Sequence, residues 1–175
     1  DELLARVAAG DQCLDIGGHI GALTVSLAEA AADVQVVAVE PDPDSAAVLR
    51  ANLEWRGLER VELLRGALRT HAPAPTTTLY RAALNPSVNS CVPSRGRESI
   101  EVPVVTVADL LRACVRPPTV AKVDIEGGEY EVLPPLLAAC PGLRLLSLEL
   151  HYTKRAFAAH LAPALSELLG LFGFR

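Results

Sequence analysis

The sequence predicts an α/β fold built on a doubly wound, mostly parallel sheet, and two patterns support this. Short β-branched apolar runs alternate along the chain with stretches of helical period. Most of these runs are apolar at nearly every position, which is typical of strands covered by helices on both faces. The length of 175 residues suits one domain, which we place at residues 1–175.

The parallel strands are expected at five apolar runs: residues 12–16, 34–39, 61–64, 119–125 and 143–150. The helix after the first run places Ile20, Leu23 and Leu27 on one face, at the spacing of an amphipathic helix. The next helix begins at Asp42, a capping residue followed directly by proline, and ends near Gly57. This alternation predicts parallel strands joined by right-handed crossovers.

Between about Thr70 and Val107 the alternation is interrupted. The segment has no helical period but holds prolines and two strand-like runs, at residues 76–80 and 100–105. We therefore expect an irregular insertion with an antiparallel excursion before the fourth parallel strand, and loops of this length are commonly functional. A short helix from Thr106 then leads into the fourth strand.

Toward its end the sequence predicts an amphipathic helix at residues 161–171 and the start of another strand at 172–175. A doubly wound sheet normally continues past this point. Because Asp1 stands where an initiator Met would, we expect the sequence to be part of a longer chain. The last strands then lie beyond Arg175 or come from elsewhere.

Composition and charge exclude several classes of protein. Hydrophobic residues make up 50% of the chain and charged residues 21%, with a net charge of -5, whereas disordered chains combine low hydrophobicity with high net charge. The sequence lacks the basic stripe of a duplex-binding protein, an apolar run near the roughly 20 residues of a membrane helix, and a signal peptide. Its four cysteines show no metal-binding spacing. We therefore expect a cytoplasmic protein with reduced thiols and with no metal, nucleic-acid or membrane partner.

A glycine-containing turn after the first strand is the first candidate for ligand binding, and it holds Asp15, Gly17, Gly18, His19 and Gly21. Glycines let a nucleotide-like ligand approach the backbone, and a helix amino terminus offers free N–H groups. The spacing Asp-x-Gly-x-x-x-Gly differs from the Gly-x-Gly-x-x-Gly of dinucleotide-binding proteins. An acid ahead of the first glycine suits a ligand with an ammonium group, which favours S-adenosylmethionine over NAD. The alternative role of these glycines is tight packing of helix on strand.

A second acid supports a ligand that contains adenosine. Glu40 ends the second strand directly before Pro41. In both nucleotide-binding classes a carboxylate at this place binds the two ribose hydroxyls. The alternative for Glu40 is an acid that caps the next helix. Gly66 and Ala67, which follow the third strand, complete the candidate cofactor-binding residues.

Three segments together resemble a known family: residues 14–21, 39–41 and 121–129, of which the Lys-x-Asp-x-Glu-Gly-x-Glu block in the last is the specific part. They are similar to the FkbM family of S-adenosylmethionine-dependent methyltransferases, over most of the chain from about residue 13 to 175. The resemblance implies a Rossmann-like class I methyltransferase fold and O-methylation of hydroxyls on small natural products or sugars. The sequence departs from the family at His19, where Asn is usual, and at Pro134-Pro135, which we expect to interrupt the helix after the block.

Charged side chains gather at the carboxyl end of the fourth strand, where an open α/β sheet binds its ligands. Asp124 is the expected base or acceptor-orienting residue, with Glu126 beside it and His151 as the alternative base. Lys122 lies on the same strand face as Asp124 and is expected to pair with Asp124 or Glu149.

Each of these candidates also has a plainer interpretation. Lys122 and Asp124 can form a structural ion pair, Glu126 can cap the following helix, and His151 can be an ordinary strand-end histidine. The acids are also of the type that holds a divalent cation, although we predict no metal.

The acceptor is expected to be a hydroxylated small molecule, contacted by Asn89 and Ser90 of the insertion, with Arg95 and Arg97 available for an acidic group on it. The oligomeric state is left open, with a homodimer as one option. Two other functions remain. One is a non-catalytic methyltransferase-like module of a larger synthase, and the other is an NAD-type oxidoreductase, which the glycine spacing and Asp15 disfavour.

Overall fold

The computed structural model describes residues 2–82, 89–93 and 97–151, together with Glu167, Leu169, Gly170 and Gly173. In the predicted helix at 161–171, the three described residues are helical. The rest of that helix, the predicted strand at 172–175 apart from Gly173, and Arg95 lie outside the described residues.

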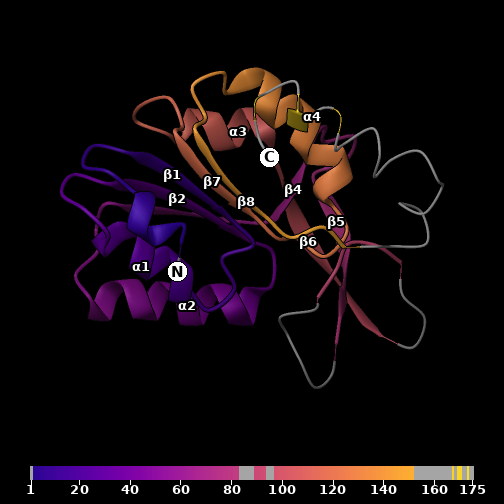
Figure 1. The fold of residues 1–175 in the computed structure, drawn as a ribbon. Helices are drawn as coiled ribbons and strands as arrows, with labels where there is room; N and C mark the ends of the chain where they lie inside the picture. The colour runs from indigo at the N-terminus through magenta and orange to yellow at the C-terminus, as the bar shows by residue number, and fades with distance from the viewer. Residues whose placement is uncertain are drawn as a thin grey trace.

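Within these residues the main sheet has five parallel strands in the order β3-β2-β1-β7-β8 (Figure 1). Asp15 of β1 lies opposite Ala38 of β2 on one side and Lys122 of β7 on the other. Each strand overlaps a predicted run, and the bounds are β1 (Gln12–Ile16), β2 (Gln35–Glu40), β3 (Val61–Arg65), β7 (Val120–Val123) and β8 (Leu145–Leu148). The predicted doubly wound sheet is confirmed.

Helices cover both faces of this sheet, as strands that are apolar on both sides require. Helices α1 and α2 lie on one face, and α3 and α4 lie on the other (Figure 1). Alternate strand residues serve the two layers, so Cys13 packs into the core with α1 and α2, and Leu14 packs into the core with α3 and α4. The bounds are η1, a 3-10 helix (Leu4–Arg6), α1 (Ala22–Glu29), α2 (Pro43–Trp55), α3 (Val107–Arg112) and α4 (Glu129–Ala139).

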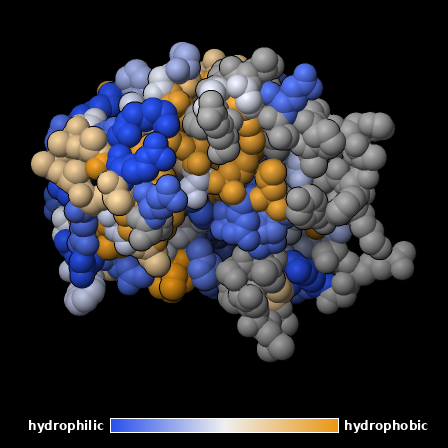
Figure 2. Space-filling model, in the orientation of Figure 1, coloured by the Kyte–Doolittle hydropathy of each residue, from blue (hydrophilic) through white to orange (hydrophobic). Residues whose placement is uncertain are grey.

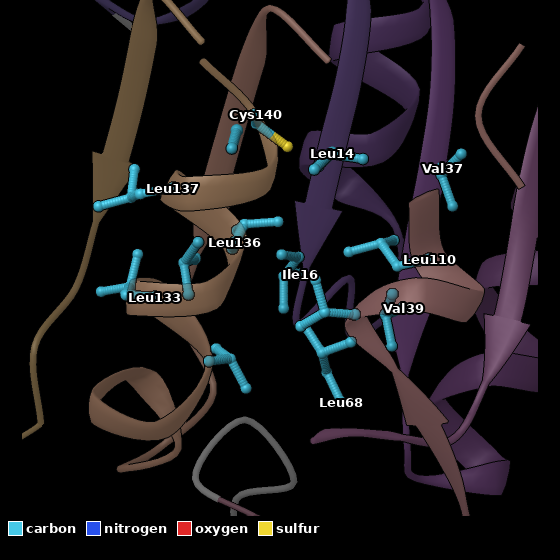
Figure 3. Close-up of a cluster of buried hydrophobic side chains, with 14 of the residues drawn as sticks. Leu14, Ile16, Val37, Val39, Leu68, Leu110, Leu133, Leu136, Leu137 and Cys140 are labelled. Atoms are coloured by element: carbon cyan, nitrogen blue, oxygen red, sulfur yellow. The ribbon is translucent and has the colours of Figure 1, made fainter. Parts of the chain in front are cut away.

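The larger core lies between the sheet and the layer of α3 and α4. Figure 3 shows Leu133 and Leu136 of α4 on one side of Ile16 and Leu110 of α3 on the other, and all four side chains are fully buried. Burying one such side chain stabilises the fold by roughly 1.5–3 kcal/mol. This layer therefore fixes the carboxyl ends of the strands, where ligands bind in such sheets.

Strand β8 lies at one edge of the sheet, and its residues Leu146, Ser147 and Leu148 are only partly buried. Figure 2 shows apolar side chains gathered in the middle of the face on which β8 lies.

In the described part of the chain, no helix combines the length and hydropathy needed to cross a membrane. The four cysteines, all described, are free thiols.

The insertion forms a second sheet, in the order β4-β6-β5, with bounds β4 (Ala67–Arg69), β5 (Thr76–Arg81) and β6 (Glu98–Thr106). The predicted antiparallel excursion is confirmed by the pairing of β5 with β6. The pairing of β4 with β6 is parallel and was not predicted. A strand of three residues gives no readable alternation, so the sequence offers no signal for it.

Helix α4 contains Pro134 and Pro135 yet continues to Ala139, so the predicted interruption is wrong. A proline lacks the N–H that donates to the carbonyl four residues earlier, which for Pro135 is that of Glu131. Thr70, just after β4, replaces the missing bond: its Oγ1 donates to the Glu131 carbonyl at 2.8 Å, and its N–H donates to the Glu131 carboxylate at 3.0 Å. The helix tolerates this proline because the end of β4 is hydrogen-bonded to it.

Candidate functional site

A cavity of about 260 Å³ opens at the carboxyl ends of β1, β2 and β7, where the sequence predicts a ligand site. Its wall comes from the turn after β1, the end of β2, strand β4, the insertion and the loop after β7. Most of the candidate residues line it, namely Gly17, Gly18, His19, Glu40, Pro41, Ala67, Asn89, Lys122, Asp124 and Glu126. Asp15, Gly21, Gly66, Ser90 and His151 lie outside this lining.

The turn after β1 is shaped by packing as much as by any ligand. Gly17 has a φ of 86°, and a Cβ atom there would lie 1.9 Å from the carbonyl oxygen of Asp124. A Cβ at Gly21 would lie 2.8 Å from Leu49 Cγ, and one at Gly66 would lie 2.7 Å from the Pro103 carbonyl oxygen. Gly17 and Gly21 are therefore closely packed, but against the Asp124 carbonyl and helix α2 rather than helix on strand as the alternative had it, and their predicted role in cofactor binding stays a prediction.

Glu40 presents a nearly buried carboxylate to the cavity, with 6% of the residue exposed. Its Oε2 accepts the N–H of His19 at 2.8 Å, and its Oε1 accepts the N–H of Asp42 at 2.9 Å. Burial raises the pKa of Glu40 to about 7, against the opposing effect of these two hydrogen bonds. Helix α2 is capped by Asp42, whose Oδ1 accepts from the next two N–H groups, so the alternative role of Glu40 as that cap is taken by Asp42.

Asp15 lies behind the lining and is fully buried. The hydroxyl of Thr24 donates to its Oδ2 at 2.5 Å, whereas its Oδ1 accepts no hydrogen bond from the described part of the chain. Burial raises the pKa of Asp15, and the nearby charge of Lys122 opposes that shift. The direct contact that the sequence predicts between Asp15 and a bound ammonium group stays a prediction.

Lys122 contacts both the glycine turn after β1 and Asp124 in the loop after β7. Its ammonium group donates to the Gly17 carbonyl at 2.7 Å and lies 3.3 Å from Asp124 Oδ2 and 3.7 Å from Asp15 Oδ1. The predicted pairing with Asp124 is therefore present, and Glu149 pairs with His151 instead. An ammonium group that reaches both the glycine turn and Asp124 fixes the position of one relative to the other.

The loop after β7 folds around the carboxylate of Glu129, which is fully buried. The N–H of Ile125 donates to its Oε1 at 3.0 Å, and the N–H of Gly127 donates to its Oε2 at 3.0 Å. Glu126 has a φ of 52°, which is uncommon for a residue other than glycine and is concentrated at functional sites. The loop therefore directs Glu126 into the cavity, while Glu129 accepts the backbone N–H groups on either side of it.

His151, which follows β8, completes this end of the site from outside the cavity lining. Its Nδ1 lies 3.0 Å from Glu129 Oε1. Its Nε2 lies 3.4 Å from Glu126, 3.6 Å from Glu149 and 3.9 Å from Asp124. Burial alone would lower the pKa of His151, but the hydrogen bond to Glu129 and the surrounding carboxylates outweigh it and raise the pKa. Burial and the neighbouring acids raise the pKa of Glu126, and His151 opposes that shift.

Asp124, Glu126 and His151 offer oxygen and nitrogen atoms that lie within 4.8 Å of one another, close enough to hold a divalent cation. Exposed acidic groups often lie this close without an ion. The geometry therefore assigns no metal to this group.

The insertion covers the cavity with residues that sequence reasoning identified only in part. Asn89 lines the cavity, donates to Asp42 Oδ2 at 3.1 Å and accepts the N–H of Ala82 at 2.8 Å. Ser90 is buried and donates to the Glu126 carbonyl, so it holds the loop rather than a ligand. Leu79 of β5 and Cys91, in a bend of the insertion, also line the cavity and were missed, because a single apolar residue gives no sign of facing a ligand.

Two solved methyltransferase structures share the fold over nearly the whole chain. Precorrin-6y C5,15-methyltransferase from Geobacter metallireducens GS-15 covers 97% of this chain and 66% of its own, at 16% identity and a TM-score of 0.54. An rRNA methylase from Streptococcus thermophilus covers 97% and 75%, at 14% identity and a TM-score of 0.54. At these identities the likeness establishes the Rossmann-like class I methyltransferase fold and nothing further.

The family follows from the sequence itself. Residues 15–175 match the family model described as the methyltransferase FkbM domain, and the chain belongs to that family. A protein-L-isoaspartate O-methyltransferase is similar over 36% of this chain and 20% of its own, at 25% identity and a TM-score of 0.34. This chain spans less than two thirds of that protein and of the precorrin methyltransferase. A comparison with curated proteins gives no significant match.

The methyl donor that the family implies is S-adenosylmethionine, and the residues of the cavity fit it. Glu40 offers a buried carboxylate to a ribose diol, and Ile20, Leu23 and Leu68 offer apolar surface to an adenine ring. Asp15 lies behind the lining, and the Lys122 ammonium group is 3.7 Å from its Oδ1, so it contributes no direct contact to this fit.

Proposed function

We propose that this chain is an S-adenosylmethionine-dependent O-methyltransferase that acts on a hydroxyl of a small molecule, such as a natural product or a sugar. The observation that carries the proposal is the continuity of the cavity. Glu40 lies at one end and Asp124 and Glu126 lie at the other. Lys122 lines the same cavity and contacts the Gly17 carbonyl and Asp124. A donor and an acceptor can therefore meet inside one enclosure.

The donor supplies, when bound, a methyl group on a sulfonium, which is already a good leaving group. The chain then has to position the acceptor oxygen, and such pre-positioning can be worth roughly 7–11 kcal/mol. The turn at Gly17 and the carboxylate of Glu40 hold the donor end, while Asp124 and Glu126 hold the acceptor hydroxyl.

The acceptor hydroxyl must also lose its proton as the new carbon–oxygen bond forms. Asp124 is the residue best suited to accept it, because it lines the cavity and its oxygens remain partly exposed. The raised pKa of His151 favours the imidazolium. An imidazolium balances the charge of the surrounding acids, but it has no free lone pair with which to accept a proton, so His151 is less suited than Asp124 to be the base. His151 is therefore kept as the alternative base.

The test combines a binding measurement with an assay. Calorimetry with S-adenosylmethionine, S-adenosylhomocysteine and NAD identifies the ligand, and release of S-adenosylhomocysteine over a panel of hydroxylated acceptors identifies transfer. Donor binding with transfer supports the proposal. Donor binding with no transfer to any acceptor would favour the non-catalytic module, and binding of NAD alone would favour an oxidoreductase. The cytoplasmic location, the homodimer and a role in natural-product biosynthesis stay predictions.

A further inference from the structure

The carboxylate of Glu129 lies at the centre of the acceptor end without lining the cavity. It is fully buried at the start of α4, whereas Asp124 and Glu126 of the preceding loop line the cavity. Burying a charge is unfavourable unless it is hydrogen-bonded and paired. The donors that satisfy Glu129 therefore indicate what it does.

Three groups from two separate segments donate to this carboxylate. Two are the backbone N–H groups of Ile125 and Gly127, in the loop that carries Glu126. The third is the ring of His151, whose Nδ1 lies 3.0 Å away. An ionised carboxylate only accepts hydrogen bonds, so Nδ1 must carry the hydrogen.

This hydrogen bond determines which way the histidine ring faces. With Nδ1 directed at Glu129, Nε2 points to the opposite side, where Glu126, Glu149 and Asp124 lie within 3.4–3.9 Å. The side chains of these three acids are more exposed than that of Glu129, and Asp124 is also paired with Lys122. The Nε2 side of the ring therefore faces Asp124 and Glu126 of the cavity lining, together with Glu149 outside it.

We propose that Glu129 is a positioning residue for methyl transfer, which fixes the orientation of the His151 ring, its tautomer when the ring is neutral, and the shape of the loop that presents Asp124 and Glu126. A carboxylate that orients a functional histidine through its second nitrogen is a recurrent device, and at metal-bound histidines the loss of such a partner typically costs 10–100-fold in metal affinity or activity. The proposal rests on the proposed function for its catalytic part, whereas the hydrogen bond itself can be tested without turnover.

The test compares Glu129→Gln with wild type and with Glu54→Gln, a control that removes an exposed glutamate from α2. The ¹⁵N spectrum of the His151 ring, assigned by its loss in His151→Gln, is recorded at high pH, where the imidazole is neutral. We expect a proton on Nδ1 in wild type and in the control. In Glu129→Gln the neutral amide is a weaker acceptor with a single oxygen, so we expect the preference for Nδ1 to fall and a mixture of the two tautomers to form. A purely structural role for Glu129 would leave the tautomer unchanged.

The kinetic arm uses a double-mutant cycle. We expect Glu129→Gln to lower kcat roughly 10–100-fold while the KM for S-adenosylmethionine changes less than about twofold. In the His151→Gln background the same change should have little further effect, because Glu129 acts through His151. Fully additive losses, or tautomer populations in folded Glu129→Gln that equal those of wild type, would overturn the proposal.

Two outcomes remain informative if this variant or the activity fails. If Glu129→Gln does not fold, the wild-type spectrum decides, since a neutral His151 protonated on Nε2 contradicts the proposed hydrogen bond. If no acceptor is methylated, the proposed function is at fault, while the ring spectrum still supports or refutes the role of Glu129.

Discussion

The two ends of the cavity are built in different ways. At the Glu40 end the hydrogen bonds come from the backbone: the N–H groups of His19 and Asp42 donate to a carboxylate whose residue is only 6% exposed. At the Asp124 end, the lining side chains of Asp124 and Glu126 are 30% and 21% exposed, and His151 faces both of them from outside the lining. Under the proposed function, the backbone-built end is the donor end and the charged, more open end is the acceptor end.

The largest expected effect tests whether the two ends depend on each other. Gly17→Ala places a Cβ 1.9 Å from the Asp124 carbonyl, so the ends of β1 and β7 must separate. We expect a loss of several kcal/mol in the free energy of unfolding, measured by chemical denaturation. Gly57→Ala is the matched control: Gly57 also has a positive φ but open space around it, so we expect only about 1–2 kcal/mol. Equal losses would show that Gly17 does not join the two ends.

The second prediction separates the ends functionally. Asp124→Asn removes the proton acceptor but keeps the size of the side chain, so we expect kcat to fall about 100-fold or more. The Kd for S-adenosylmethionine should change little, because the donor end does not use this carboxylate. Asp33→Asn, which removes an exposed acid that pairs with Arg116, serves as the control. Wild-type turnover in Asp124→Asn would remove Asp124 from the mechanism.

The third prediction concerns the pH dependence of the Glu40 end. The pKa of Glu40 is raised to about 7, and only the ionised carboxylate is a strong acceptor for a ribose diol. The ionised fraction falls as pH falls through 7, so the affinity for S-adenosylhomocysteine should drop about tenfold from pH 8 to pH 6. Calorimetry at several pH values measures this, and Glu40→Gln should bind weakly with little pH dependence. A flat profile in wild type would contradict the buried position of Glu40.

The smallest expected effect lies outside both ends. Thr70→Val removes the hydroxyl that donates to the Glu131 carbonyl, which Pro135 leaves without its helical partner. We expect a loss of about 1 kcal/mol and a small fall in Tm, measured by thermal unfolding. Thr76→Val, at an exposed position of β5, should be close to neutral. No difference between the two variants would mean that the helix does not need this bond.

The fold could be predicted because its signals are local. Apolar runs covered on both sides indicate parallel strands, and Asp42-Pro43 indicates the start of α2, which begins at Pro43 as expected. Thr106 and Asp109 form a capping box at the start of α3, close to the predicted short helix. Each of these signals lies within a few residues, so no knowledge of tertiary contacts is needed.

The candidate site was predictable only as a set of residue types. The reason for a glycine at position 17 is the Asp124 carbonyl, which depends on the pairing of β1 with β7. The hydrogen bond between Glu129 and His151 joins residues 22 positions apart, and the Thr70 bond to Glu131 joins residues 61 apart. Such contacts follow from the packing of distant segments, which the spacing of residues along one chain does not encode.

The most direct test of a single cavity with a donor end and an acceptor end is the Kd of S-adenosylhomocysteine, measured by calorimetry on wild type, Glu40→Ala and Asp124→Asn. We predict binding of one ligand per chain, a loss of at least about tenfold in Glu40→Ala, and a change below about threefold in Asp124→Asn. Undetectable binding to wild type, or equal affinities for wild type and Glu40→Ala, would contradict the account.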